Sequence, residues 1–215
     1  MENTMISVKN VVKRFGDETV LQGITHDFEK GRIYGIVGNN GAGKTVFFKC
    51  ICGFLIPEEG EIYVNGKQIG KEADFPESVG IIIEAPGFLP NISGYKNLKL
   101  LADLNGRIQS DEIKETIGRV GLDPKSRKHV GKYSLGMKHR LGIAQAIMED
   151  PDLLILDEPF NGLDKHGVVE MRELIKSLRE KGKTILLASH NAEDIEILCD
   201  EVYEMDAGLL SLKNE

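Results

Sequence analysis

One octapeptide limits the possible folds of this chain more than any other feature. Residues 38–45, Gly-Asn-Asn-Gly-Ala-Gly-Lys-Thr, match the pattern G-x-x-x-x-G-K-[ST]. They follow a short apolar run at 33–37, which is typical of a strand buried on both faces, and they precede a segment, 45–53, that predicts a helix ending at Gly53. Glycines let the backbone curl so that N–H groups converge on phosphate oxygens. The octapeptide therefore predicts a phosphate-binding loop, and the alternative is an ordinary glycine turn.

The end of this loop carries the expected chemistry. A lysine in this position reaches the β- and γ-phosphates of a nucleotide, and the following hydroxyl ligates Mg²⁺, so we assign these roles to Lys44 and Thr45. The start of the following helix adds a positive dipole end. The predicted nucleotide-binding set in this region is Gly38, Asn39, Asn40, Gly41, Ala42, Gly43, Lys44, Thr45 and Val46.

A second apolar run ends in two acids. Residues 153–156 predict a buried strand, and Asp157 and Glu158 emerge at its carboxyl end, where open α/β sheets bind ligands. Beside a phosphate loop, Asp157 is expected to hold Mg²⁺ through water. Glu158 is expected to act as a general base on the attacking water. The alternative is a pair of solvated acids at a strand end.

The other apolar patterns predict an α/β fold. Short strands are expected at 6–12, 24–28, 61–64, 80–84 and 184–188, helical spacing dominates 93–148, and a helix is expected at 168–179. The order strand, helix, strand favours a parallel sheet with an inserted helical segment. The charged run at 179–183 predicts a solvated helix end.

Composition argues against several classes of protein. The 27 basic and 34 acidic residues give a net charge of −7, which disfavours a general nucleic-acid binder. Three cysteines cannot form a paired disulfide framework, so Cys50, Cys52 and Cys199 are expected to be buried thiols in a reducing compartment. The first residues lack a secretory signal, and no apolar run approaches the roughly 18 residues of a spanning helix. Any membrane role is therefore expected to require a partner.

Three shorter segments narrow the class. Residues 133–140 precede a helical stretch with Ser134 as a natural N-cap, residues 161–164 follow the two acids, and Ser189 and His190 close the strand at 184–188. With the phosphate loop and the acidic strand, in this order and spacing, these segments resemble the nucleotide-binding subunits of ATP-binding cassette (ABC) transporters. The resemblance covers essentially the whole chain.

This resemblance implies a fold and cofactors. It implies an α/β P-loop NTPase of the ABC type, with an antiparallel β subdomain and an inserted helical subdomain. The chain is expected to be one ABC ATPase domain, 1–215, with a nucleotide-binding core at 1–84 and 150–215 and a helical subdomain at about 85–149. The implied cofactors are ATP and Mg²⁺.

It also implies roles for residues outside the phosphate loop. Phe15 is expected to stack on adenine. Without the resemblance, a position in the core and a role in stacking are equally favoured for this residue. His190 is expected to contact the γ-phosphate as a catalytic residue, with Lys44 and Glu158. The resemblance further places Ser134, Gly136 and Asp164 at nucleotide held between two subunits.

Two departures from the family pattern matter. The family signature Leu-Ser-Gly-Gly-Gln is replaced here by Tyr-Ser-Leu-Gly-Met at 133–137, so Met137 cannot make the polar contacts of a glutamine amide. In Ile83-Glu84-Ala85-Pro86, Glu84 stands where the family has a loop glutamine, and its carboxylate can bind Mg²⁺ or its water. This combination resembles the bacitracin-export and lantibiotic-immunity branch.

The resemblance therefore predicts the ATP-hydrolysing subunit of an exporter. Two such subunits, a homodimer or a pair with a second cassette, close around ATP and drive a multi-span membrane permease. The chain is expected to be cytoplasmic and peripheral on the inner face of the membrane, with no nucleic-acid partner. One alternative is a non-transport ABC ATPase with a soluble assembly partner. A small-molecule kinase or GTPase is a further alternative, but it leaves Ser134 and His190 without a role.

Overall fold

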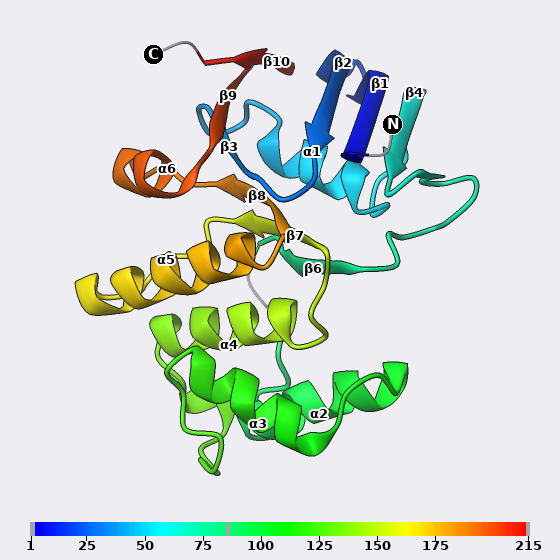
Figure 1. The fold of residues 1–215 in the computed structure, drawn as a ribbon. Coiled ribbons are helices and arrows are strands. Elements are labelled where there is room, and N and C mark those ends of the chain that lie inside the picture. Colours follow the sequence, from blue (N-terminus) through cyan, green and yellow to red (C-terminus); the bar gives the residue numbers. More distant parts are fainter. Residues whose placement is uncertain (1–2, 85–86, 214–215) are drawn as a thin grey trace.

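The computed structural model describes residues 3–84 and 87–213, which form two sheets with helices on both faces of the larger one (Figure 1). The smaller sheet is antiparallel, in the order β2-β1-β4-β5. Its strands are β1 (Thr4–Phe15), β2 (Glu18–Glu29), β4 (Glu59–Val64) and β5 (Lys67–Gln68). Strands β1 and β2 are longer than 6–12 and 24–28 because they form one bulged hairpin, in which polar residues face solvent.

The larger sheet has six strands in the order β10-β9-β3-β8-β7-β6. They are β3 (Ile33–Val37), β6 (Val79–Ile82), β7 (Leu153–Asp157), β8 (Thr184–Ala188), β9 (Glu201–Asp206) and β10 (Leu209–Leu212). All neighbours pair in parallel except β10, which is antiparallel to β9. The carboxyl ends of β3, β6, β7 and β8 therefore meet at one edge, which we call the carboxyl edge. The opposite side, where these strands begin, is the amino edge.

Helices cover both faces of the six-stranded sheet. They are α1 (Lys44–Ile51), α2 (Gly94–Asn105), α3 (Ser110–Arg119), α4 (Leu135–Ile147), α5 (Lys165–Glu180) and α6 (Ala192–Leu198), with a 3-10 turn at Val130–Lys132. In Figure 1, α2, α3 and α4 form a layer beyond β6 and α5, away from the antiparallel sheet.

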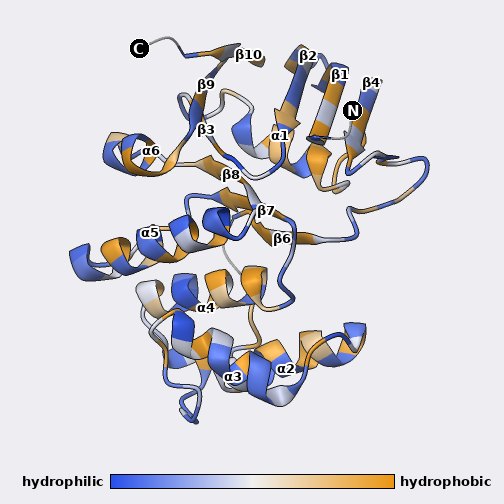
Figure 2. Cartoon of the chain, in the orientation of Figure 1, coloured by the Kyte–Doolittle hydropathy of each residue, from blue (hydrophilic) through white to orange (hydrophobic). Residues whose placement is uncertain are grey.

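Strand β7 shows why its apolar run is continuous. Leu153 and Ile155 pack into a core with α1 and the antiparallel sheet, whereas Leu154 and Leu156 pack into a second core with α2, α3, α4 and α5. A strand buried on both faces cannot alternate with polar residues. Figure 2 shows the same continuous hydrophobic colour on β7 and β8.

Element ends differ from the sequence predictions where capping decides them. Helix α1 ends at Ile51 rather than Gly53, which follows its cap with φ 78°. Strand β6 ends at Ile82, and Glu84 has the left-handed φ of 62°. Helix α5 begins before 168 because the Asp164 side chain accepts a hydrogen bond from the Gly167 N–H at 2.7 Å.

The charged run at 179–183 is exposed as predicted except at its last residue. Lys183, expected in a solvated run, is only 8% exposed, and its Nζ donates to the Asp150 carbonyl at 2.8 Å. The sequence patterns also did not identify α6, β9 or β10, because these elements are short and β9 alternates only weakly.

The cysteines are free and largely enclosed. Burial raises the pKa of Cys50, Cys52 and Cys199 to about 12, so these thiols stay protonated. Across 3–84 and 87–213, none of the helices is both long enough and apolar enough to cross a bilayer.

Candidate functional site

The glycine loop connects β3 to α1 at the carboxyl edge, and its glycines are required by close packing. Gly38 has φ 147°, and a Cβ there would lie 2.1 Å from the Met205 carbonyl oxygen. Gly43 has φ 109° and directly precedes α1, whose first N–H groups have no side-chain cap. Uncapped N–H groups at a helix start can bind an anion. The loop thus has the backbone geometry that its sequence predicts.

Lys44 forms hydrogen bonds with carbonyl groups of this loop. Lys44 is only 7% exposed, and its ammonium donates to the Gly38 carbonyl at 2.6 Å and the Asn39 carbonyl at 3.1 Å. These carbonyls are weak partners for a full positive charge compared with a phosphate oxygen. The ammonium is therefore held where a phosphate can replace them.

A cavity of about 600 Å³ opens over the loop and gathers most of the predicted residues. The predicted residues that line it are Phe15, Asn39, Asn40, Gly41, Gly43, Lys44, Thr45, Val46, Glu84, Asp157, Glu158 and His190. Gly38 and Ala42 belong to the loop but do not line this cavity, because Gly38 packs against the Met205 carbonyl and Ala42 is buried in the core that contains α1. Predicted residues from five separate segments of the chain thus meet in one place.

Glu158 is placed by an unusual backbone. It has φ 52°, in the left-handed region that costs a non-glycine residue about 1–2 kcal/mol. Its N–H donates to the Ala188 carbonyl at 2.9 Å, which joins the end of β7 to the end of β8. His190, two residues beyond that carbonyl, brings its Nε2 to 3.5 Å from Glu158 Oε1. Strain at a site is typical of a functional constraint.

The carboxyl group of Glu158 is poorly solvated. Within the part of the chain that the structure describes, its Oε1 is buried and accepts no hydrogen bond. Burial raises the pKa of Glu158, and the nearby His190 opposes this shift. A carboxylate with a raised pKa is a better proton acceptor than an ordinary glutamate.

Thr45 and Asp157 form the part of the site that fits Mg²⁺. The Thr45 hydroxyl donates to Asp157 Oδ2 at 2.7 Å, so hydroxyl and carboxylate oxygens lie together beside the phosphate loop. Mg²⁺ commonly binds one or two such groups together with water and substrate phosphates. Accordingly, no group of three or more His, Cys, Asp or Glu side chains among the described residues is arranged to hold a metal alone.

Glu84 lines the cavity from the end of β6 but is already paired. Its Oε1 lies 2.6 Å from Lys49 Nζ, and its side chain is 65% exposed. Contact with Mg²⁺ would therefore have to compete with Lys49. Ala85 and Pro86, the rest of the sequence motif at this point, lie outside the described residues.

Phe15 lies at the entrance rather than in the core. Its side chain is 48% exposed at the end of β1, and Lys13 Nζ lies 5.3 Å from its ring centroid. This exposure is inconsistent with the core alternative. An exposed ring beside a phosphate loop offers a face for a flat base.

The remaining predicted residues form a second group outside the cavity. Ser134 caps α4 by accepting a hydrogen bond from the Met137 N–H at 3.2 Å. A Cβ on Gly136 would lie 2.7 Å from the Gly162 carbonyl oxygen, so the start of α4 touches the loop that ends in Asp164. None of Ser134, Gly136 and Asp164 lines the cavity over the glycine loop.

Sequence reasoning missed His139. No sequence pattern assigns it a role, yet it lines the cavity with Glu158 and Asn161. Among the described residues its Nδ1 is buried without a partner, and burial lowers the pKa of the ring. The only available signal was its place on the helix that Ser134 caps.

Comparison with known sequences identifies a family. A sequence model described as ABC transporter matches residues 21–161. An uncharacterized ABC transporter ATP-binding protein of Bacillus subtilis (strain 168), YybJ, is 44% identical over 96% of this chain and 94% of its own length. Bacitracin transport ATP-binding protein BcrA of Enterococcus faecalis is 42% identical, over 96% of this chain and 68% of its own. Lantibiotic transport ATP-binding protein SrtF of Streptococcus pyogenes is 36% identical, over 98% and 91%.

Solved structures show the same fold. One described as the ATP-binding subunit of an ABC transporter superposes with a TM-score of 0.88 at 27% identity, over 98% of this chain and 90% of that one. A dimeric ATP-binding cassette in a post-hydrolysis state, bound to ADP and Pi, superposes with a TM-score of 0.87 over 98% of both chains. The identity to the dimer is 21%, so that likeness concerns the fold alone.

Proposed function

The chain belongs to the ATP-binding subunits of ABC transporters, and from this premise we propose that it hydrolyses ATP with Mg²⁺ to drive a membrane permease. The ABC-type α/β fold expected from the sequence is confirmed by the structural neighbours. Family membership also decides against a small-molecule kinase or GTPase. We further propose that the transporter exports a peptide antibiotic or a similar compound.

One observation carries the proposed hydrolysis. Lys44, Glu158 and His190, which lie in the segments that follow three neighbouring parallel strands, line one cavity. Their chemistry is complementary: a cation for phosphate, a desolvated carboxylate for a proton, and an imidazole 3.5 Å from that carboxylate. A site that only bound nucleotide would not need the strained Glu158.

The glycine loop and Phe15 would bind ATP. The N–H groups of the loop and of the α1 start would surround the β- and γ-phosphates, while the Lys44 ammonium exchanges its carbonyl partners for phosphate oxygens. Phe15 would stack on the adenine. Thr45 and Asp157 would hold Mg²⁺, which neutralises part of the phosphate charge when it is bound.

Glu158 would act in the chemical step. A water oxygen attacks the γ-phosphorus, the bond from that phosphorus to the β–γ bridging oxygen breaks, and ADP departs with the bonding electron pair. Glu158 takes the proton of the water, and His190 donates a hydrogen bond to the γ-phosphate. Because Glu158 is partly desolvated, its affinity for that proton is increased.

The second group of residues would serve a partner subunit. Ser134 and Gly136 at the start of α4, with Asp164, would face the nucleotide that the opposite subunit holds at its own Lys44. Two copies would then close around two ATP molecules, because ATP contacts both surfaces only in the closed state. Hydrolysis would remove these contacts and reopen the pair.

A groove beside Glu84 would receive the permease. It has a volume of about 400 Å³ and is lined by β6, the last turn of α4 and the side chains of Phe54 and Leu101. Glu84 lines both this groove and the nucleotide cavity, so it links the two. We propose that 85–149 moves as a helical subdomain against the core, 1–84 and 150–215, and that the permease follows this motion. The chain would then be cytoplasmic and peripheral on the inner face of the membrane.

Phosphate release and membrane association test the proposal together. The purified chain is expected to release phosphate from ATP with Mg²⁺ and to stop when EDTA removes the metal. In cells, the tagged chain is expected to fractionate with membranes and to co-purify with a multi-span membrane protein.

A matched pair of variants makes the second test specific. Phe54→Glu is expected to release the chain from membranes, whereas Leu209→Glu, an equally exposed position on β10 (54% against 52%), is expected to leave it bound. Co-purification with a soluble partner alone would instead favour the non-transport ABC ATPase.

A further inference from the structure

A buried ion pair connects helices α5 and α6. Arg172 on α5 is only 6% exposed, and Asp194 on α6 only 2%. The guanidinium donates to Asp194 Oδ1 from Nε at 2.9 Å and from Nη2 at 2.5 Å, and it also reaches Glu193 Oε2 at 3.0 Å. Burying a charge is costly unless it is paired and hydrogen-bonded, so this pair fixes α5 and α6 in one relative position.

The ion pair continues to the residue next to His190. Ser189, which is 7% exposed, donates its hydroxyl proton to Asp194 Oδ2 at 2.8 Å. The same hydroxyl oxygen accepts a hydrogen bond from the Asn191 N–H at 3.1 Å. The backbone is therefore held on both sides of His190 through one hydroxyl group.

The His190 side chain itself is exposed and weakly held. Its side chain is 51% exposed, and its contact with Glu158 is a long 3.5 Å. A catalytic group must be held close to its productive geometry, and supporting residues supply that precision when the group itself is exposed. Fixing the backbone around His190 limits where its ring can go.

We propose that Arg172, Asp194 and Ser189 are positioning residues that hold His190 opposite Glu158 for ATP hydrolysis. This inference rests on the proposed ATPase function. In this arrangement the Arg172 charge orients Asp194, Asp194 orients the Ser189 hydroxyl, and the hydroxyl fixes the backbone of 189–191. None of the three residues lines the cavity over the glycine loop, so we expect them to act on turnover rather than on ATP binding.

Ser189→Ala is the main variant, because removing one hydroxyl leaves the Arg172–Asp194 pair intact. We expect kcat to fall about tenfold, which corresponds to the loss of one well-placed hydrogen bond to a charged group. The KM for ATP is expected to stay within about twofold. Ser189→Thr retains the hydroxyl and is expected to recover most of the activity.

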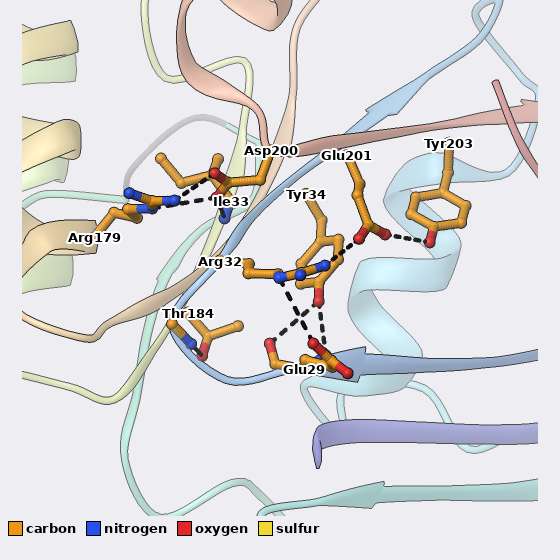
Figure 3. A network of polar contacts seen from close by, with 10 residues as sticks. Glu29, Arg32, Ile33, Tyr34, Arg179, Thr184, Asp200, Glu201 and Tyr203 are labelled. Carbon is orange, nitrogen blue, oxygen red and sulfur yellow. Dashed lines mark hydrogen bonds and ion pairs between the residues drawn. The ribbon is translucent and has the colours of Figure 1, made fainter. Parts of the chain in front are cut away.

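Thr184→Val is the matched control. Thr184 begins the same strand, β8, is fully buried and accepts a hydrogen bond from the Gly31 N–H at 3.0 Å, but it lies at the amino edge (Figure 3). Its loss is expected to lower the melting temperature without lowering kcat. Arg172→Gln leaves a buried carboxylate unpaired, and the serine variants keep the proposal testable if that chain does not fold.

A double-mutant cycle separates positioning from plain stability. In single-turnover assays, Ser189→Ala is expected to slow wild type about tenfold but to have little further effect on His190→Ala, because it acts through that histidine. Equal slowing in both backgrounds, or a Ser189→Ala variant with wild-type kcat, would overturn the inference. A wild-type chain without ATPase activity would contradict the proposed function instead.

Discussion

The two edges of the six-stranded sheet differ in whether their polar groups have partners. At the amino edge, polar groups are paired: the Ile33 N–H donates to Asp200 Oδ2 at 2.8 Å, and Arg179 reaches the same carboxylate at 2.6 Å (Figure 3). At the carboxyl edge, Glu158 has a left-handed backbone and a buried oxygen that, among the described residues, lacks a hydrogen-bond partner.

The difference indicates that one edge of the sheet serves stability and the other serves binding or turnover. Paired polar groups stabilise a fold. A desolvated carboxylate, or a cation with weak hydrogen-bond partners, reduces stability but is available to bind a ligand. Substitutions at the amino edge should therefore change stability, and equivalent substitutions at the carboxyl edge should change binding or turnover.

Two buried lysines give the largest expected contrast. Lys44→Ala at the carboxyl edge is expected to weaken ATP binding at least about 100-fold, because the phosphates lose a desolvated charge partner. Lys183→Ala at the amino edge removes an ammonium that also donates to a carbonyl, at 2.8 Å, and is expected to leave ATP affinity within about twofold.

Calorimetric titration with ATP measures both affinities, and thermal unfolding measures both stabilities. Equal losses of ATP affinity in the two variants would remove the distinction between the edges.

Asp200→Ala tests the stabilising role of the amino edge. The buried Ile33 N–H and the Arg179 guanidinium lose their acceptor, so we expect unfolding to become easier by about 1–3 kcal/mol. The kcat is expected to change by less than about twofold. Urea unfolding and phosphate release, measured on the same preparation, check the two halves of this prediction. A large loss of kcat at full folding would contradict it.

The carboxyl edge should impose a pH dependence. Because the pKa of Glu158 is raised above its ordinary value of 4.5, kcat is expected to fall on the acid side with a midpoint above that value, by about tenfold per pH unit. The folded chain binds the Glu158 proton more tightly than the unfolded chain does. The contribution of Glu158 to stability therefore declines as the pH rises from 4.5 through the raised pKa.

A His190→Gln variant has no imidazole at this position, so its acid limb can be assigned to Glu158. An acid midpoint at or below 4.5 in that background would contradict the desolvated state of Glu158.

Glu84→Gln has the smallest expected effect. The pair with Lys49 is mostly exposed, so stability is expected to change by less than about 0.5 kcal/mol. If Glu84 contacts Mg²⁺ or its water, the Mg²⁺ concentration for half-maximal turnover should rise by about threefold.

Glu77→Gln is the matched control, since Glu77 forms a similarly exposed pair with Lys67 at 2.5 Å that does not line the cavity. An identical Mg²⁺ requirement in both variants would exclude Glu84 from the metal site.

Much of the carboxyl edge was predictable because its signals are local. The glycine loop, the acids after β7 and His190 after β8 each follow an apolar run, and parallel strands bring such ends together. The placement of Phe15 and Glu84 beside the cavity came from the family resemblance rather than from any pattern. Their roles, like those of the other site residues, stay predictions.

The amino edge and the supporting residues could not be predicted. Asp200 and Lys183 read as surface charges, and they are buried or paired only because distant segments cover them. Arg172 and Asp194 are 22 residues apart on two amphipathic helices, and no local spacing marks them as partners. Such contacts depend on tertiary packing, which a single sequence does not express as a period.

The central claim is that Glu158 activates water in an ATP site shared by two subunits. Sedimentation and phosphate release of Glu158→Gln, with ATP and Mg²⁺, test it most directly. We predict that the variant binds ATP, loses hydrolysis at least about 100-fold and sediments as a dimer. A Glu158→Gln chain that remains a monomer and hydrolyses ATP at the wild-type rate would contradict the claim.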